Sequence, residues 1–212
     1  VSFIQFGIVL ILVFSLPLWK INDKKTEVSG KESKPLIGIR GALKIRGVPF
    51  LLTGFFAYCA AEATAMLWAS SYLESVADLP KDEAAALGSL FFIGITAGRF
   101  LSGFISDKLG DNRMIRLGTG VAIFGVVLIA IPTFAPVYPC IIHSTPYNFG
   151  AENSQGIIGI QMASAYVGST FMPPLFGVIA NGISLRLMPV FLAFFFVLLL
   201  VMIGQTEKRC KK

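Results

Sequence analysis

The sequence predicts an all-α integral membrane protein with about seven membrane segments, one of them shortened. Of its 212 residues 55% are hydrophobic and only 14% are charged, whereas about a quarter of the residues in a soluble domain are charged. Long apolar runs recur along the chain and are separated by polar joints. Lysines and arginines gather in these joints, as they do in the inner loops of membrane proteins. We therefore expect a multi-pass protein of the cell membrane, with the lipid bilayer as its surroundings.

The basic charge and the cysteines exclude several other classes of function. The formal net charge is +6, but its place in the joints indicates the inner membrane surface and no nucleic-acid partner. The three cysteines, Cys59, Cys140 and Cys210, lie far apart in the sequence. They form neither a disulfide framework nor a metal-ligand spacing, so we expect no metal and no cofactor.

The first apolar run covers residues 1–19, close to the length of about 20 residues that a membrane helix needs. It ends at Trp19 and Lys20, an interfacial aromatic followed by an inner charge. The chain starts with neither a methionine nor a charged leader segment, so this run does not resemble a signal peptide. We expect residues 1–19 to be the last helix of a preceding region of a longer protein.

Residues 20–46 are the one long polar segment, rich in lysine and arginine, and we predict a central cytoplasmic loop there. From residue 36 to residue 50 basic and apolar residues alternate. This part is either a short helix on the inner membrane surface or an ordinary linker. Residues 47–212 are then the carboxy-terminal transmembrane bundle.

The bundle is expected to contain six segments: 48–73, 84–106, 117–131, 135–145, 156–181 and 187–204. An acidic, external loop follows the first of them, and the basic tail from Glu207 is cytoplasmic. The hairpin over residues 117–145 is too short, because two spans with a turn need more than about 40 residues. Either the hairpin is thinned or about one helix length is missing, and we treat 135–145 as a truncated crossing.

One of the joints carries a motif. It reads Gly103-Phe104-Ile105-Ser106-Asp107-Lys108-Leu109-Gly110, followed by Arg113. The motif resembles the cytoplasmic loop signature of the major facilitator superfamily; the alternative is a generic short basic turn. The resemblance implies half of a major-facilitator-type helix bundle, transmembrane helices 6 to 12 of twelve. It also implies that Asp107 and Arg113 belong to a cytoplasmic gate facing the missing amino-terminal bundle. The candidate gate residues are Arg99, Gly103, Asp107, Gly110 and Arg113.

Finer features resemble the fucose-permease-like sugar:proton symporter branch of that superfamily. They are Phe56-Ala57-Tyr58-Cys59-Ala60-Ala61-Glu62, Trp68-Ala69-Ser70-Ser71-Tyr72-Leu73, Pro136-Val137-Tyr138-Pro139 and His143-Ser144-Thr145-Pro146. The resemblance implies rocker-switch transport between two six-helix bundles, with the substrate bound between them near the membrane midplane. The absent first bundle and the shortened hairpin are the departures from that family.

Glu62 is the leading candidate site residue because it is the only acidic residue deep in an apolar run, and carboxylates inside membranes are functional candidates by default. At 100° per residue, Tyr58, Trp68 and Tyr72 share an arc of about 120° with it. Carboxylates and aromatic faces are typical of sugar sites, so we predict these four as substrate contacts. The alternative is a packing face in which a protonated Glu62 bonds to a neighbour.

A second arc contains Gln161, another candidate substrate contact, although its small neighbours favour helix packing. Pro173 and Pro174 should break or kink this helix. His143 could carry a proton, but its place beside Ser144 favours a hydrogen-bonding role at a helix end.

Taken together, the sequence predicts a fragment of a secondary active transporter that moves a small polar solute, a sugar, by alternating access coupled to protons. A non-transporting half-size subunit or an inactive remnant is the alternative. With one histidine, no paired catalytic carboxylates on one face, no phosphate loop and no metal cluster, the chain is not expected to be an enzyme.

Overall fold

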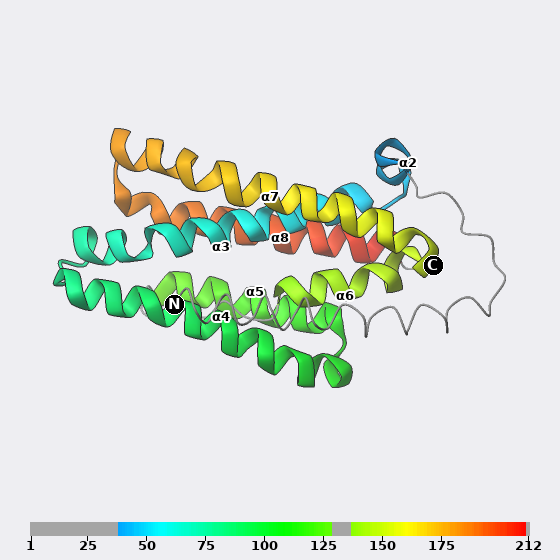
Figure 1. The fold of residues 1–212 in the computed structure, drawn as a ribbon, viewed down its shortest axis with the longest axis horizontal. Helices are drawn as coiled ribbons and strands as arrows, with labels where there is room; N and C mark the ends of the chain where they lie inside the picture. Colours follow the sequence, from blue (N-terminus) through cyan, green and yellow to red (C-terminus); the bar gives the residue numbers. More distant parts are fainter. Residues whose placement is uncertain (1–37, 129–136, 211–212) are drawn as a thin grey trace, which may run out of the picture. The chain divides into compact units, whose positions relative to one another are not determined.

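The computed structural model describes residues 38–128 and 137–210, which belong to one unit covering Leu36–Lys212. Every element in the described residues is helical (Figure 1): α2 (Ile39–Lys44), α3 (Val48–Val76), α4 (Lys81–Leu109), α5 (Asp111–Leu128), α6 (Val137–Phe149), α7 (Ala151–Gly182), the 3-10 turn η1 (Leu185–Leu187) and α8 (Met188–Cys210). The predicted span 1–19 and most of the predicted loop 20–46 lie outside the described residues.

Glycines make the shortest joints between these helices. Gly110 alone separates α4 from α5, with φ +77°, and Gly150 alone separates α6 from α7, with φ +83°. Only a residue without a Cβ adopts this left-handed backbone at little cost. The glycine of the sequence motif, Gly110, therefore permits a one-residue turn between two antiparallel helices.

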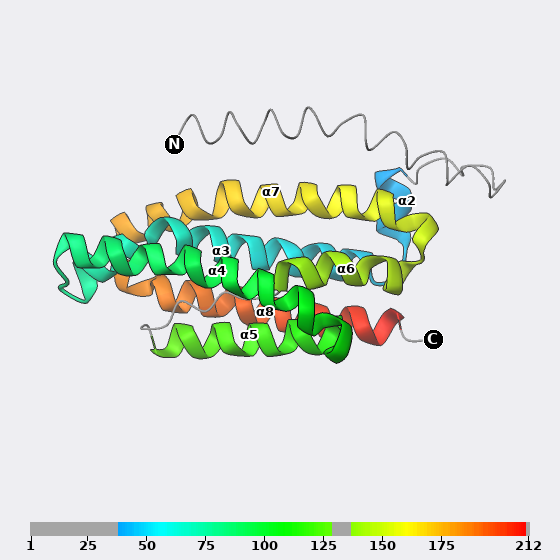
Figure 2. The same ribbon diagram turned by 60° about the horizontal axis from the view of Figure 1, so that its bottom comes forward.

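The helix α3 lies at the centre of the described bundle. It packs most extensively against α7 and α8, and it also contacts α2, α4 and α6. Figures 1 and 2 both show α3 between α7 and α4. Aromatic pairs join it to its two main neighbours, Trp68–Phe176 to α7 and Phe56–Phe195 to α8. The pairs Phe176–Phe191, between α7 and α8, and Phe191–Phe195, within α8, continue this aromatic cluster. Such pairs contribute about 0.5–1.5 kcal/mol each beyond their burial.

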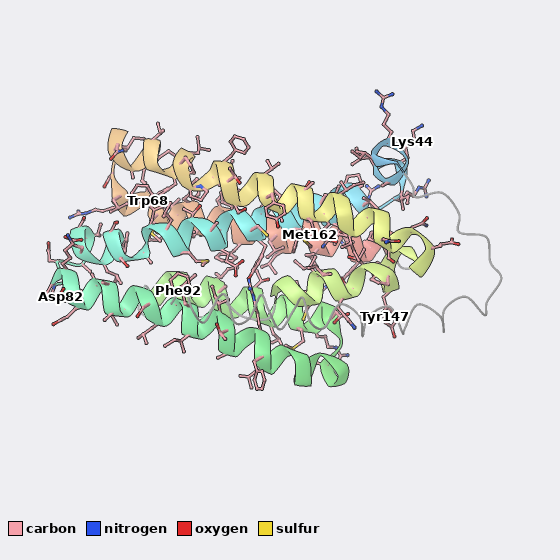
Figure 3. The ribbon with its side chains drawn as sticks, in the orientation of Figure 1. Lys44, Trp68, Asp82, Phe92, Tyr147 and Met162 are labelled. Carbon is pink, nitrogen blue, oxygen red and sulfur yellow. The ribbon has the colours of Figure 1, made fainter. Side chains whose placement is uncertain are left out.

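The outer faces of α4, α7 and α8 carry large exposed apolar side chains. They include Phe92, Ile93, Phe100, Phe171, Val178, Val190 and Phe194. Exposed apolar surface of this extent is unfavourable in water and favourable in lipid. The side-chain view in Figure 3 shows Phe92 on α4 as one example of this surface.

Four helices in the described ranges are long and apolar enough to cross a membrane: Val48–Val76, Lys81–Leu101, Glu152–Gly182 and Leu185–Cys210. By contrast, α6 has 13 residues. At 1.5 Å per residue it is about 20 Å long, against a hydrocarbon core of about 30 Å. The expected shortened segment is therefore confirmed, as is the all-α membrane fold.

The sequence predicted a break or a kink at Pro173 and Pro174. The break is wrong, because α7 continues through both residues from Ala151 to Gly182, and the kink stays a prediction. A proline in a membrane helix removes one backbone donor, and contacts from neighbouring helices can satisfy freed groups. The carbonyls freed by these two prolines are those of Ser169 and Thr170, four residues earlier. Separately, Trp68 Nε1 of α3 donates to the Pro173 carbonyl oxygen at 3.1 Å and joins the two helices there. The same helix also begins five residues earlier than the predicted start at Gly156.

Two helix backbones approach each other closely at Gly168 of α7. A Cβ added there would lie 2.7 Å from the Phe56 carbonyl oxygen and 3.2 Å from the Ala60 nitrogen. Both atoms are backbone atoms of α3, so neither can move aside without moving that helix. Gly168 thus allows α3 and α7 to meet.

We expect Gly168→Ala to destabilise the bundle by about 1–3 kcal/mol, the usual range for overpacking. The matched control is Gly159→Ala on the same helix, where an added Cβ meets nothing within 4 Å. That control should be neutral or stabilising by about 0.5–1 kcal/mol, because alanine is the better helix former. Thermal unfolding of both variants in detergent measures the difference, and equal midpoints would contradict the close approach.

Candidate functional site

Glu62 lies in the interior of α3, with 7% of its surface exposed, and Tyr58 one turn earlier is 1% exposed. The helix forms here because the surrounding residues are apolar helix formers without an internal proline. Burying a carboxylate without partners is costly. The position of Glu62 therefore requires donors from nearby side chains.

Two donors meet one oxygen of this carboxylate. Tyr58 Oη donates to Glu62 Oε1 at 3.0 Å, and Arg99 Nη2 of α4 donates to the same oxygen at 2.9 Å. The side chain of Arg99 is 44% exposed and that of Glu62 is 10% exposed. A carboxylate has about four lone-pair sites, so Glu62 keeps acceptor capacity for a further hydroxyl or amide.

Trp68 and Tyr72, predicted on the same arc as Glu62, have different surroundings. Trp68 bonds to Pro173, and its ring lies 5.7 Å from that of Phe176. Figure 3 places Trp68 beside α7. Tyr72 is buried farther along α3. The structure thus joins Tyr58 to Glu62 directly and holds Trp68 against α7.

Gln161 lies on α7 and is fully buried. Its Oε1 is 3.0 Å from Thr145 Oγ1, which is also 3.1 Å from the Ile141 carbonyl oxygen. The Thr145 hydroxyl is thus shared between two acceptor oxygens. The other polar atom of the Gln161 amide, Nε2, has no hydrogen-bond partner among the described residues. Leaving such a group unpaired costs about 1–3 kcal/mol, so a small polar molecule could pair with it.

Of the predicted gate residues, Arg99 joins Glu62, Gly110 makes the turn and Arg113 is exposed. The side chains of residues 102–108, Asp107 among them, lie outside the described part. Polar contacts that the sequence reasoning missed connect neighbouring helices at this end: the ion pair Arg116–Glu207 between α5 and α8, and the Asp111–His143 contact between α5 and α6. The partners are 91 and 32 residues apart in the sequence, so no spacing rule could have predicted these contacts.

The expected place of His143 at a helix end is wrong. It lies inside α6, with Nδ1 2.9 Å from Asp111 Oδ2. Thr145 follows two residues later, which is 200° around a helix. The two side chains therefore face opposite neighbours, His143 toward α5 and Thr145 toward α7.

We expect Glu62 and Arg99 to be energetically coupled. Glu62→Gln and Arg99→Gln should each destabilise the chain, and the double variant should lose less than the sum by about 0.5–3 kcal/mol, the usual coupling for contacting residues. Equilibrium unfolding of the four proteins in mixed detergent measures it. Repeating the cycle with Arg113→Gln, in place of Arg99→Gln, is the control and should be additive; additivity at Arg99 would show that the pair makes no stabilising contact.

Comparison with known proteins accords with this architecture. The family model of the Major Facilitator Superfamily matches residues 1–151. No curated protein and no solved structure matches the chain. The matched range includes the turn motif, Glu62 and Arg99, and it covers more than half of the sequence. The chain belongs to the major facilitator superfamily, whose members are membrane transporters rather than enzymes.

Proposed function

We propose that this chain is the carboxy-terminal part of a secondary active transporter that moves a sugar by alternating access, together with protons. The observation that carries the proposal is the cluster of buried Tyr58 and Glu62 with the partly exposed Arg99 in a superfamily member. Ionisable groups inside a membrane mark substrate and ion pathways. In transporters of this kind the substrate lies between two repeats near the midplane, which implies an amino-terminal bundle opposite α3.

The chemistry of the cluster suits a sugar. The Glu62 carboxylate has unused acceptor sites for hydroxyl groups, and the buried Tyr58 hydroxyl orients it by donating to one oxygen. Gln161 offers an amide atom without a protein partner in the described structure. Trp68 and Tyr72 stay predicted aromatic contacts to the sugar, on either side of the cluster. Trp68 could contact a sugar only through the part of its surface that α7 does not cover.

The same cluster offers a route for coupling to protons. An ionised Glu62 attracts the Arg99 guanidinium, and a proton bound to the carboxylate removes that attraction. Protonation would then release Arg99 of α4 from α3. In a symporter, proton binding must alter the conformation of the helix bundle. The contact between Glu62 and Arg99 supplies such a link, because it joins α3 to α4 only while the carboxylate is charged.

The remaining gate residues fit this proposal as a contact between bundles. We infer that Gly103, Asp107, Gly110 and Arg113 face the missing amino-terminal bundle when the transporter is closed on the cytoplasmic side.

The second candidate function is a half-size subunit or a remnant without transport. Its supporting observation is the length of α6, 13 residues, which is too short to cross the membrane alone.

Charge supports an orientation with the tail in the cytoplasm. Exposed basic residues surround the end at which α3 begins and α8 terminates, whereas Glu74, Asp78, Asp82 and Glu83 gather at the other end. Figure 3 shows Lys44 and Asp82 at these opposite ends. The positive-inside rule then assigns the basic end to the cytoplasm.

We expect a membrane-impermeant maleimide to label Ala77→Cys in intact cells and Lys208→Cys only after permeabilisation. Both replacements are at exposed positions and would be made in a background without Cys59, Cys140 and Cys210. Labelling of Lys208→Cys in intact cells would reverse the proposed orientation.

We expect Glu62→Gln to weaken sugar binding about ten- to hundredfold, because a hydrogen bond to a charged group contributes about 1.5–3 kcal/mol. The measurement is calorimetric titration with L-fucose and other monosaccharides on this chain fused to a matching amino-terminal bundle. Glu62→Ala should be at least as weak.

The control for this experiment is Glu74→Gln, which removes an exposed carboxylate from the same helix and should bind normally. Unchanged affinity in both Glu62 variants would leave Glu62 a packing residue. Absence of binding in the unsubstituted fusion would favour the non-transporting alternative.

A further inference from the structure

The end of the bundle where α3 begins and α8 terminates carries exposed basic residues, and we call it the basic rim. Its exposed basic residues are Arg40, Lys44, Arg46, Arg113, Arg116, Lys208 and Arg209. The described acids nearby are fewer, and two are already paired, Asp111 with His143 and Glu207 with Arg116. The Arg209 guanidinium lies 4.7 Å from the centre of the Phe50 ring, so the end of α8 packs on the start of α3, two residues after Arg46. The rim therefore carries a net positive charge.

The short helix α2 presents three distinct faces at this rim. Ala42 is fully buried, and α2 contacts α7 and α3. At 100° per residue, Arg40 and Lys44 lie opposite Ala42, and Ile39 and Leu43 lie between the two. Ile39 is 65% exposed and Leu43 is 44% exposed, so an apolar face stands uncovered directly beside a basic one.

The position of α2 along the bundle explains this arrangement. It precedes the first turn of α3 and contacts α7, and both of these helices are long enough to cross a membrane. Figures 1 and 2 show it at the end where α7 begins, and Lys44 points away from the bundle in Figure 3. A helix at this level lies where headgroups meet acyl chains, the depth at which amphipathic helices bind.

We propose that α2 is an interfacial anchor that binds anionic phospholipids of the leaflet beside it. Ile39 and Leu43 enter the acyl boundary, and Arg40 and Lys44 contact the lipid phosphates, with Arg46 and Arg209 adding to the positive field. A lipid surface satisfies both faces at once, since it offers apolar and anionic chemistry at adjacent depths. The inference concerns a lipid-binding surface and is independent of the transported solute.

The test is hydrogen exchange of the whole chain in nanodiscs of phosphatidylcholine alone and of equimolar phosphatidylcholine and phosphatidylglycerol. The reporters are the amides of Ala42 and Ile45, which donate to Gly38 and Ala42 carbonyl oxygens at 3.0 and 3.1 Å. Each basic residue near an anionic surface strengthens binding about fivefold, so Arg40 and Lys44 together should slow exchange by up to about 25-fold in the anionic discs.

The Arg40→Gln/Lys44→Gln variant should lose this difference between the two lipids. The matched control, Lys81→Gln/Arg186→Gln, removes the same charge from exposed positions at the opposite end and should keep it. Ile39→Ser/Leu43→Ser should exchange faster in both lipids. Equal protection of the unsubstituted chain in the two lipids would overturn the proposal, whether or not the variants fold. Loss of the difference in the control, or its reproduction by inorganic phosphate in neutral discs, would also overturn it.

Discussion

The packing of α3 between α7, α8 and α4 is the constraint on which the rest of the described bundle depends. Gly168 allows the backbone of α7 to reach that of α3, and aromatic rings from α7 and α8 fill the space alongside. A helix so enclosed has little access to water. The carboxylate of Glu62 must therefore obtain its donors from protein, and it does so from its own helix and from α4.

That requirement determines how α4 is held. Near its start, a Cβ at Gly88 would overlap Ser70 Oγ of α3, so the two helices touch there. Farther along, Arg99 reaches back to Glu62. Between these points the outer face of α4 exposes Phe92 and Ile93. One of the two attachments is thus the ion pair between Glu62 and Arg99.

The sequence could predict what depends on local composition and could not predict what depends on helix rotation. Hydropathy located the long helices, and the missing length between residues 117 and 145 predicted a short α6. The partner of Glu62 is 37 residues away, and no spacing rule links positions on two helices until their relative rotation is known. An arc of about 120° is also wide enough for its members to face different neighbours. That is why Trp68 contacts α7 while Tyr58 contacts Glu62.

In the short helix α6, polar contacts to the neighbouring helices compensate for a small buried apolar surface. A helix of 13 residues has less surface to bury than its neighbours, so packing alone holds it less firmly. His143 and Thr145, on opposite faces, join it to Asp111 of α5 and Gln161 of α7. A polar contact on each side fixes the rotation of α6, because a turn of the helix would break both. Thr145 contacts only one polar atom of the Gln161 amide, its Oε1. The other, Nε2, has no protein partner in the described residues. The contact that orients the shortened helix thus also leaves the buried polar atom on which the proposed solute site partly depends.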